Sequence, residues 1–148
     1  MTQIDKIRQI TMEVLSKVGV PSKDAKVVAD SILYANMRGK HTHGIGRLPI
    51  YVRKIKKGLM DPFTTISTVQ DSKAVTVLNA NHGFGQVIGV KAMTLCVAKA
   101  KEYGVGIVGV RNSNNFGTAG FLGEIAVKNN MIGIVLGNSS PAIAPYGG

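Results

Sequence analysis

The chain has 148 residues, of which 45% are apolar, and a formal net charge of +10 at pH 7. This length and apolar content are typical of one folded domain or part of a larger one, and they exclude a disordered tail. The 18 glycines and the aromatic content of 5% favour tight turns and close approach of backbone to a ligand. They argue against an aromatic stacking platform for single-stranded nucleic acid.

The positive charge is concentrated in a stretch with no Asp or Glu between Asp30 and Asp61. Seven basic residues lie in that stretch: Arg38, Lys40, Arg47, Arg53, Lys54, Lys56 and Lys57. Such a charge attracts carboxylates, phosphates, nucleic acid or an acidic protein without choosing among them. Nucleic acid is the least favoured partner, because no nucleic-acid motif is present and only Tyr51 interleaves the charges.

The single cysteine, Cys96, rules out an internal disulfide and favours a cytoplasmic location. Its apolar neighbours indicate an inert, buried thiol. No apolar run approaches the roughly 18 residues of a membrane span, and the first residues lack the apolar core of a signal peptide. We therefore expect a cytoplasmic protein with no membrane contact.

The first part of the chain, residues 1–60, is predicted to form a helical cap that carries a substrate loop. Apolar residues recur at helical spacing over 4–18 and 25–33, and glycines follow both segments, which predicts two antiparallel helices. The segment 40–47 has no periodicity and reads as a loop. Pro49 then favours the start of a third helix, which Gly58 ends.

The second part, residues 61–148, is predicted to form an α/β layer. Its strands are expected over 73–78, 105–110 and 131–136, with helices over 86–103 and from Thr118 to about 129. This alternation predicts right-handed parallel crossovers with buried strands. Three parallel strands would leave an open edge, so we expect further strands to belong to this fold.

Three loops at the carboxyl ends of the predicted strands are candidate ligand sites: residues 79–85, 111–117 and 138–141. None contains an acidic residue, which excludes hydrolysis by a carboxylate pair. The run from Gly83 to Gly89 reads G-x-G-x-x-x-G, one residue longer than the dinucleotide fingerprint, and Arg111 stands where an acid is expected. These glycines therefore serve either an ordinary Rossmann site, which they match weakly, or turn and helix packing.

The loop 112–118 opens a helix, and a helix N-terminus suits a phosphate. Thr118 is alternatively a structural cap of that helix.

The loop from His41 to Arg47 carries the more specific chemistry. A histidine such as His43 can exchange a proton with a substrate, and Arg47, four residues on, can hold a carboxylate through two hydrogen bonds. Together they suit a 2-oxo or 2-hydroxy acid, with Thr42 orienting the imidazole. A surface loop with incidental histidines stays open as an alternative. A metal pair at His41 and His43 is disfavoured, because no third ligand accompanies it, and we expect no metal.

Three ordered motifs extend the pattern along the chain. They are Arg38-Gly39-x-x-Thr42-His43-Gly44-Ile45-x-Arg47-Leu48-x-x-Tyr51, Asn112-Ser113-x-Asn115-Phe116-Gly117, and Gly137-Asn138-Ser139-x-Pro141-x-x-Ala144-Pro145-x-Gly147-Gly148. In these motifs the chain resembles the malate/L-lactate dehydrogenase family, which includes sulfolactate and ureidoglycolate dehydrogenases. The resemblance implies a non-Rossmann nucleotide-binding fold and a homodimer. It also implies an oxidoreductase that transfers a hydride between NAD or NADP and a 2-hydroxy or 2-oxo acid.

The resemblance also implies roles for individual residues. His43 inherits proton exchange, Thr42 the orienting hydroxyl, and Arg47 the substrate carboxylate. Contacts to the cofactor are inherited by Asn115, Phe116, Gly117, Thr118 and Ala119, and Asn138 and Ser139 lie on a loop near the nicotinamide.

The chain departs from the family pattern at three points. Thr42 replaces the usual Ser, which keeps the hydroxyl, and Asn115 replaces a usual His, which removes acid–base chemistry at that position. Family chains are also considerably longer, so the rest of the cofactor site is expected beyond Gly148. A truncated, non-catalytic remnant that binds a nucleotide or dimerises is therefore the alternative hypothesis. The sequence leaves open the hydroxy acid and the choice between NAD and NADP.

Overall fold

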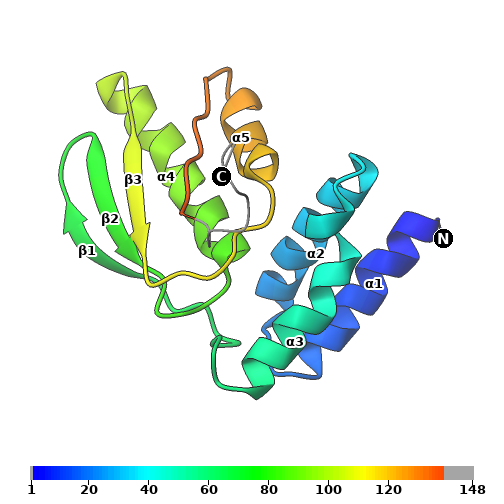
Figure 1. The fold of residues 1–148 in the computed structure, drawn as a ribbon. Coiled ribbons are helices and arrows are strands. Elements are labelled where there is room, and N and C mark those ends of the chain that lie inside the picture. The colour runs from blue at the N-terminus through cyan, green and yellow to red at the C-terminus, as the bar shows by residue number, and fades with distance from the viewer. Residues whose placement is uncertain (1, 139–148) are drawn as a thin grey trace, which may run out of the picture.

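The computed structural model describes residues 2–138, which form a helical part packed against a small α/β part (Figure 1). The helical part contains α1 (Gln3–Ser16), α2 (Ser22–Met37) and α3 (Leu48–Lys56), with the 3₁₀ turns η1 (His41–His43) and η2 (Ile45–Arg47) between α2 and α3. The α/β part contains β1 (Ser67–Asp71), β2 (Val75–Asn79), α4 (Gly85–Tyr103), β3 (Ile107–Arg111) and α5 (Ala119–Val127). Within the described residues, no helix is long and apolar enough to cross a membrane.

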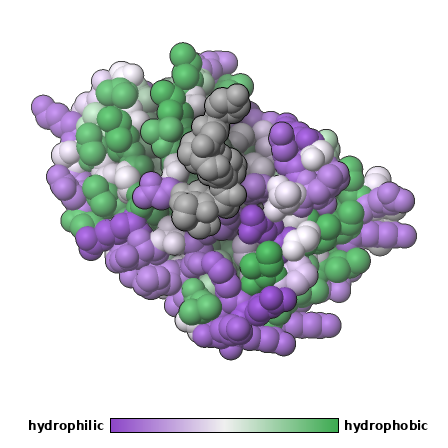
Figure 2. Space-filling model, viewed as in Figure 1, coloured by the Kyte–Doolittle hydropathy of each residue, from purple (hydrophilic) through white to green (hydrophobic). Residues whose placement is uncertain are grey.

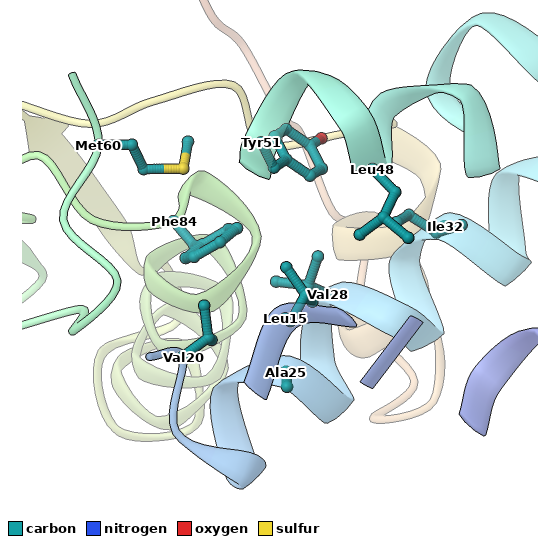
Figure 3. Packing of buried hydrophobic residues seen from close by; sticks show 9 residues of the cluster. All are labelled: Leu15, Val20, Ala25, Val28, Ile32, Leu48, Tyr51, Met60 and Phe84. Carbon is teal, nitrogen blue, oxygen red and sulfur yellow. The ribbon is translucent and has the colours of Figure 1, made fainter. Parts of the chain in front are cut away.

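The helical part forms because apolar side chains recur on one face of each helix. Their buried cluster is shown in Figure 3 and contains Leu15, Val20, Ala25, Val28, Ile32, Leu48, Tyr51, Met60 and Phe84. Phe84 immediately precedes α4 and is fully buried. Its ring packs edge-on against the Tyr51 ring at a centroid distance of 5.7 Å. One core therefore joins the three N-terminal helices to the start of α4.

The sheet has the order β1-β2-β3 and is mixed. β2 and β3 are parallel, as predicted, and α4 forms the crossover between them. β1 pairs antiparallel with β2, with a register shift between Thr68 and Gln70. The expectation of an all-parallel sheet is therefore wrong, because β1 was not predicted: all five of its residues are exposed and show no apolar alternation.

The predicted third strand over 131–136 is also wrong for the described residues. This segment is assigned to no helix or strand, although side chains of Met131 and Val135 pack onto a cluster formed by Met93, Val97 and Ala126. Its β-branched composition favours an extended backbone, but a strand also requires an adjacent strand with which its backbone can form hydrogen bonds. The predicted ligand loop that begins at Asn138 falls outside the described residues from Ser139 onward.

Helix α5 connects the two parts of the molecule. It packs on α4 and α2, and Arg38 at the end of α2 forms an ion pair with Glu124 of α5. The Arg38 guanidinium also lies over the Tyr34 ring, 3.6 Å from its centroid. Burial, followed by the nearby Glu124 charge, raises the pKa of Tyr34. These contacts hold α5 beside the helical part, where the candidate site lies.

Candidate functional site

The substrate loop predicted from sequence lies in the two 3₁₀ turns between α2 and α3. Its shape depends on Gly44, which is buried and whose backbone lies against Asn36 of α2. A Cβ at Gly44 would stand 1.7 Å from Asn36 Oδ1, so only glycine fits there without a shift. Asn36 Oδ1 accepts a hydrogen bond from the Ile45 N–H at 3.3 Å. Sequence reasoning missed Asn36, which looked like an ordinary residue near the end of a helix.

The three predicted site residues of this loop meet around Thr42. Its hydroxyl oxygen lies 3.0 Å from His43 Nδ1, and its carbonyl oxygen accepts a hydrogen bond from Arg47 Nε at 2.7 Å. The side chains of His43 and Arg47 are half-buried, whereas Thr42 is exposed. The imidazole therefore contacts the hydroxyl of Thr42 and the guanidinium contacts its carbonyl, both by local contacts alone.

The second candidate region, the loop 112–118, is held by its asparagines. Asn114 Nδ2 donates to the His82 carbonyl at 2.7 Å, and Asn114 Oδ1 accepts from Lys54 Nζ of α3 at 3.3 Å. This loop also packs closely on the start of α4, because a Cβ at Gly85 would stand 2.2 Å from the Asn114 carbonyl oxygen. The loops 79–85 and 112–118 thus form one packed unit at the ends of β2 and β3.

The glycines of the G-x-G-x-x-x-G run serve close packing. A Cβ at Gly83 would meet Thr64 at 2.7 Å, and one at Gly89 would meet the Leu122 side chain at 2.7 Å. With Gly85 against Asn114, every glycine of the run has a neighbour that a side chain would displace. Of the two interpretations left open by the sequence, these contacts support packing.

A buried hydrogen-bond network joins the two candidate regions. The hydroxyl of Tyr51, in α3, accepts from Gln86 Nε2 at 2.7 Å and donates to Asn115 Oδ1 at 3.3 Å. Tyr51 and Gln86 are 1% and 0% exposed. Burial raises the pKa of Tyr51, while the hydrogen bond from Gln86 and the charge of Arg47 lower it. Tyr51 therefore links Gln86 at the start of α4 to Asn115 in the loop 112–118.

Sequence reasoning placed Tyr51 only in the core and in a motif, and it missed the polar role of Gln86. No local pattern signals this network, because its members lie 35 and 64 residues apart along the chain. The signal that could have found them is polarity at positions predicted to face the core, since buried polar groups need partners.

The remaining predicted cofactor residues lie around the start of α5. Asn115 Oδ1 also accepts from the Gly117 N–H at 3.1 Å, and Gly117 has a φ of +77°. Thr118 occupies the predicted N-cap position, but its side chain makes no capping bond. Its Oγ1 is buried and has no hydrogen-bond partner among the described residues. Ala119 is exposed at the first position of the helix.

Phe116 and Asn138 complete the described part of the prediction. The Phe116 ring packs at Gly137, where a Cβ would stand 2.5 Å from its Cε1 atom. Asn138 follows Gly137 and is exposed, whereas Ser139 lies outside the described residues. Residues 2–138 hold no group of three or more potential metal ligands of the His, Cys, Asp and Glu types.

Comparison with known proteins gives the class of this chain. It belongs to the malate/L-lactate dehydrogenase family, whose sequence model matches residues 2–148. This match confirms the resemblance that the three motifs indicate.

Among individual relatives, the chain is 45% identical over 141 residues to the L-sulfolactate dehydrogenase of Methanocaldococcus jannaschii, a match that covers 95% of this chain and 41% of the relative. It is 42% identical over 144 residues to the malate dehydrogenase of Pyrococcus abyssi, covering 97% of this chain and 40% of the relative. The chain therefore spans about two-fifths of the length of these curated relatives.

Solved structures support the same assignment at the level of fold. The sulfolactate dehydrogenase of M. jannaschii superposes with a TM-score of 0.84 and 42% identity, covering 86% of this chain and 37% of that one. The malate dehydrogenase of Entamoeba histolytica superposes with a TM-score of 0.83 and 40% identity, covering 86% and 36%. The predicted non-Rossmann α/β fold of this family is thereby confirmed.

Proposed function

We propose that the chain carries the substrate-binding loop and part of the cofactor site of a 2-hydroxy-acid dehydrogenase that uses NAD or NADP. The observation that carries this proposal is the meeting of His43 and Arg47 at Thr42, beside the network through which Tyr51 holds Asn115. Family membership supports the reaction class, because the relatives are named malate and sulfolactate dehydrogenases. A homodimer, a cytoplasmic location and the substrate loop within residues 1–60 belong to the same proposal.

The hydrogen bonds of Arg47 leave its outer nitrogens available for a substrate. Its Nε is engaged by the Thr42 carbonyl, which fixes the plane of the guanidinium. Both Nη atoms can then donate to the two oxygens of one carboxylate. In this role Arg47 anchors and orients the acid group of a 2-hydroxy or 2-oxo acid.

The contact between Thr42 and His43 suits proton exchange in both directions. When His43 Nδ1–H donates to Thr42 Oγ1, Nε2 is the nitrogen that exchanges the proton. As an imidazolium the ring donates the Nε2 proton to a 2-oxo oxygen and becomes neutral, and as a neutral ring it accepts a proton at Nε2 from a 2-hydroxyl group. One residue pair therefore serves as acid for reduction and as base for oxidation.

The residues around the start of α5 fit a nucleotide cofactor. The first turn of α5 has backbone N–H groups without helical partners, which suit a phosphate, and Thr118 Oγ1 lacks a partner among the described residues. No acidic residue occurs from 112 to 119, so nothing there repels an anion. When bound, the nicotinamide would supply or accept the hydride. Residues 115–119, Asn138 and Ser139 are the proposed contacts.

The test compares His43→Gln with His41→Gln, an exposed neighbour in the same turn. Because this chain carries only part of the proposed cofactor site, both variants are made in this chain joined to the part of the M. jannaschii relative that it does not match. We expect that protein to oxidise NADH or NADPH with the 2-oxo form of malate, lactate or sulfolactate. Loss of the positioned acid in His43→Gln should then lower kcat by roughly 10²–10⁴, and His41→Gln should leave it unchanged. Equal kcat in His43→Gln and the unaltered chain would refute the mechanism. Calorimetric binding of NADH or NADPH without turnover of any of these acids would instead favour the non-catalytic remnant.

A further inference from the structure

Asn36, in the last turn of α2, contacts the loop that carries the proposed substrate-binding and acid–base residues. Its side chain is half-buried, and its Oδ1 accepts a hydrogen bond from the Ile45 N–H at 3.3 Å. Its backbone carbonyl accepts from the Gly39 N–H at 3.1 Å, and Gly39 has a φ of +68°, so the chain turns back at the end of the helix. Asn36 therefore ends the helix with its backbone and reaches the loop with its side chain.

Gly44, beside Asn36, joins the two 3₁₀ turns of the loop. Its N–H donates to the His41 carbonyl at 3.1 Å, and its carbonyl accepts from the Arg47 N–H at 2.9 Å, so it belongs to both turns. It is buried and so close to Asn36 that a Cβ would stand 1.7 Å from Oδ1. Movement of Gly44 would therefore change the orientation of η1, which ends at His43, relative to η2, which ends at Arg47.

The side chain of Asn36 attaches the loop 41–47 to α2. This loop is drawn in cyan in Figure 1, and the face shown in Figure 2 mixes hydrophilic and apolar side chains over the helical part, so on that face no single patch marks the site. Among the residues that the structure describes, no other side chain outside the loop forms a hydrogen bond with residues 41–47. The bonds of His43 and Arg47 to Thr42 fix these groups within the loop, whereas Asn36 fixes the loop on the helix.

We propose that Asn36 is a positioning residue of the candidate site: it holds Gly44 and thereby sets where the His43 imidazole and the Arg47 guanidinium lie relative to each other. Its side chain forms no hydrogen bond with either group, so its effect passes through the backbone of the loop. The inference rests on the proposed roles of His43 and Arg47. A misplacement of about 1 Å can cost roughly 10²-fold in rate, so loss of this attachment should be measurable in kcat.

NMR of the 148-residue chain tests the positioning without any turnover. In Asn36→Ala we expect the Arg47 Nε–H, which donates to the Thr42 carbonyl, to exchange with solvent roughly three- to tenfold faster, because the loop opens more often when one hydrogen bond is lost. The chain has three histidines, so their ring signals can be assigned by substitution. The ratio of the two neutral tautomers of His43 should shift, whereas that of His82 should not.

Two further variants separate positioning from a general loss of stability. Asn36→Asp keeps the acceptor oxygen and should restore slow exchange of the Arg47 Nε–H. Asn129→Ala is the matched control, because Asn129 is also half-buried near a helix end and its Oδ1 accepts from Lys101 Nζ at 3.2 Å, but it lies outside the loop. It should leave the Arg47 and His43 signals unchanged, although it also removes side-chain hydrogen bonds.

Turnover adds a functional readout, measured in this chain joined to the part of the M. jannaschii relative that it does not match. Asn36→Ala should lower kcat roughly 10- to 10²-fold and leave KM for NADH unchanged, because Asn36 lies outside the proposed cofactor contacts. Asn36→Asp should recover part of the loss, and Asn129→Ala should have no effect.

The inference is overturned if the Arg47 and His43 signals of Asn36→Ala match those of the unaltered chain, or if Asn129→Ala moves them equally. It is also overturned if Asn36→Asp does not restore slow exchange, or if the signals move in Asn36→Ala and kcat does not. Absence of turnover in the unaltered joined protein would instead count against the dehydrogenase proposal. The NMR comparison would still decide whether Asn36 orients the loop, so the two failures are distinguishable.

Discussion

Replacement of Tyr51 by phenylalanine tests the network that joins the two candidate regions. The substitution keeps the ring and its edge-on contact with Phe84. It removes the hydroxyl that accepts from Gln86 Nε2 at 2.7 Å and donates to Asn115 Oδ1 at 3.3 Å. Asn115 Oδ1 keeps its hydrogen bond from the Gly117 N–H, so the side chain that loses a needed hydrogen-bond partner is that of Gln86.

The size of the effect follows from the burial of Gln86. Its side chain is 0% exposed, and its Oε1 already has no partner among the described residues. Without the Tyr51 hydroxyl, the amide loses its bond at Nε2 as well. A buried polar group left without a partner costs about 1–3 kcal/mol. We expect Tyr51→Phe to lower the free energy of unfolding by about 2 kcal/mol, which is a fall in Tm of roughly 4–8 °C for a chain of this size.

Urea and thermal unfolding of four proteins measure this effect as a double-mutant cycle: the unaltered chain, Tyr51→Phe, Gln86→Leu and the double variant. Removing both partners leaves no unpaired group at this contact, so the double variant should be more stable than the sum of the single effects by about 1 kcal/mol. Tyr103→Phe is the control, because Tyr103 is 41% exposed. Additive single effects, or a Tyr51→Phe variant as stable as the control, would refute the reasoning.

Two further variants test other parts of the molecule. Gly44→Ala should lower the free energy of unfolding by about 1–3 kcal/mol, because its Cβ would stand 1.7 Å from Asn36 Oδ1. Gly46→Ala is the control: its Cβ would have its nearest neighbour 4.0 Å away, and it should cost less than about 1 kcal/mol. Equal losses of stability in the two variants, measured by thermal unfolding, would contradict the close fit at Gly44. Asp71→Asn should make the free energy of unfolding, measured by urea unfolding, depend less on pH in the acidic range. The hydrogen bond from Lys99, and then that from Thr76, lower the pKa of Asp71, so its stabilising effect is present at neutral pH and lost as the pH falls below about 4. A variant with the same pH dependence in the acidic range as the unaltered chain would show that this carboxylate is not the titrating group.

The helices and the parallel pair were predictable because their signals are local. Helical spacing of apolar residues and the glycines that follow them reflect side chains within one element. Gly104, for example, ends α4 with a φ of +81°, as its place after Tyr103 predicts. A crossover helix between two apolar runs likewise indicates parallel strands without reference to the rest of the chain.

The two segments whose strand assignment was predicted wrongly show the limit of local signals. β1 has the sequence Ser-Thr-Val-Gln-Asp and five exposed residues, so its composition predicts nothing. It is a strand because β2 offers a free edge and the chain turns back after Asp71. The segment 131–136 is the reverse case, with strand composition but no ladder among the described residues. Whether a segment forms a strand depends on an adjacent strand with which it can form hydrogen bonds as much as on its own residues. The sequence of one segment does not show whether such an adjacent strand is present.

The candidate site likewise has a part that local sequence signals predicted and a part that they did not. The meeting of Thr42, His43 and Arg47 was expected because five or fewer residues separate their contacts. The Tyr51, Gln86 and Asn115 network was not expected, because it depends on how α3, α4 and the loop 112–118 pack together. The motifs therefore gave the proposed reactive groups, whereas only the folded chain showed the residues that contact them.

Asn115 shows what this packing adds to the proposed chemistry. The Gly117 N–H is an unambiguous donor, so the atom of Asn115 that faces it is the oxygen, and the Tyr51 hydroxyl donates to that same atom. The amide nitrogen is then the group left over, and it can only donate. At the position where a family histidine would exchange a proton, this chain thus holds a neutral donor in a fixed orientation. Such a donor can bind a carbonyl or carboxylate oxygen but cannot accept a proton from a hydroxyl group. In the proposed dehydrogenase the acid–base step therefore falls to His43 alone, and this is why His43→Gln is the decisive substitution.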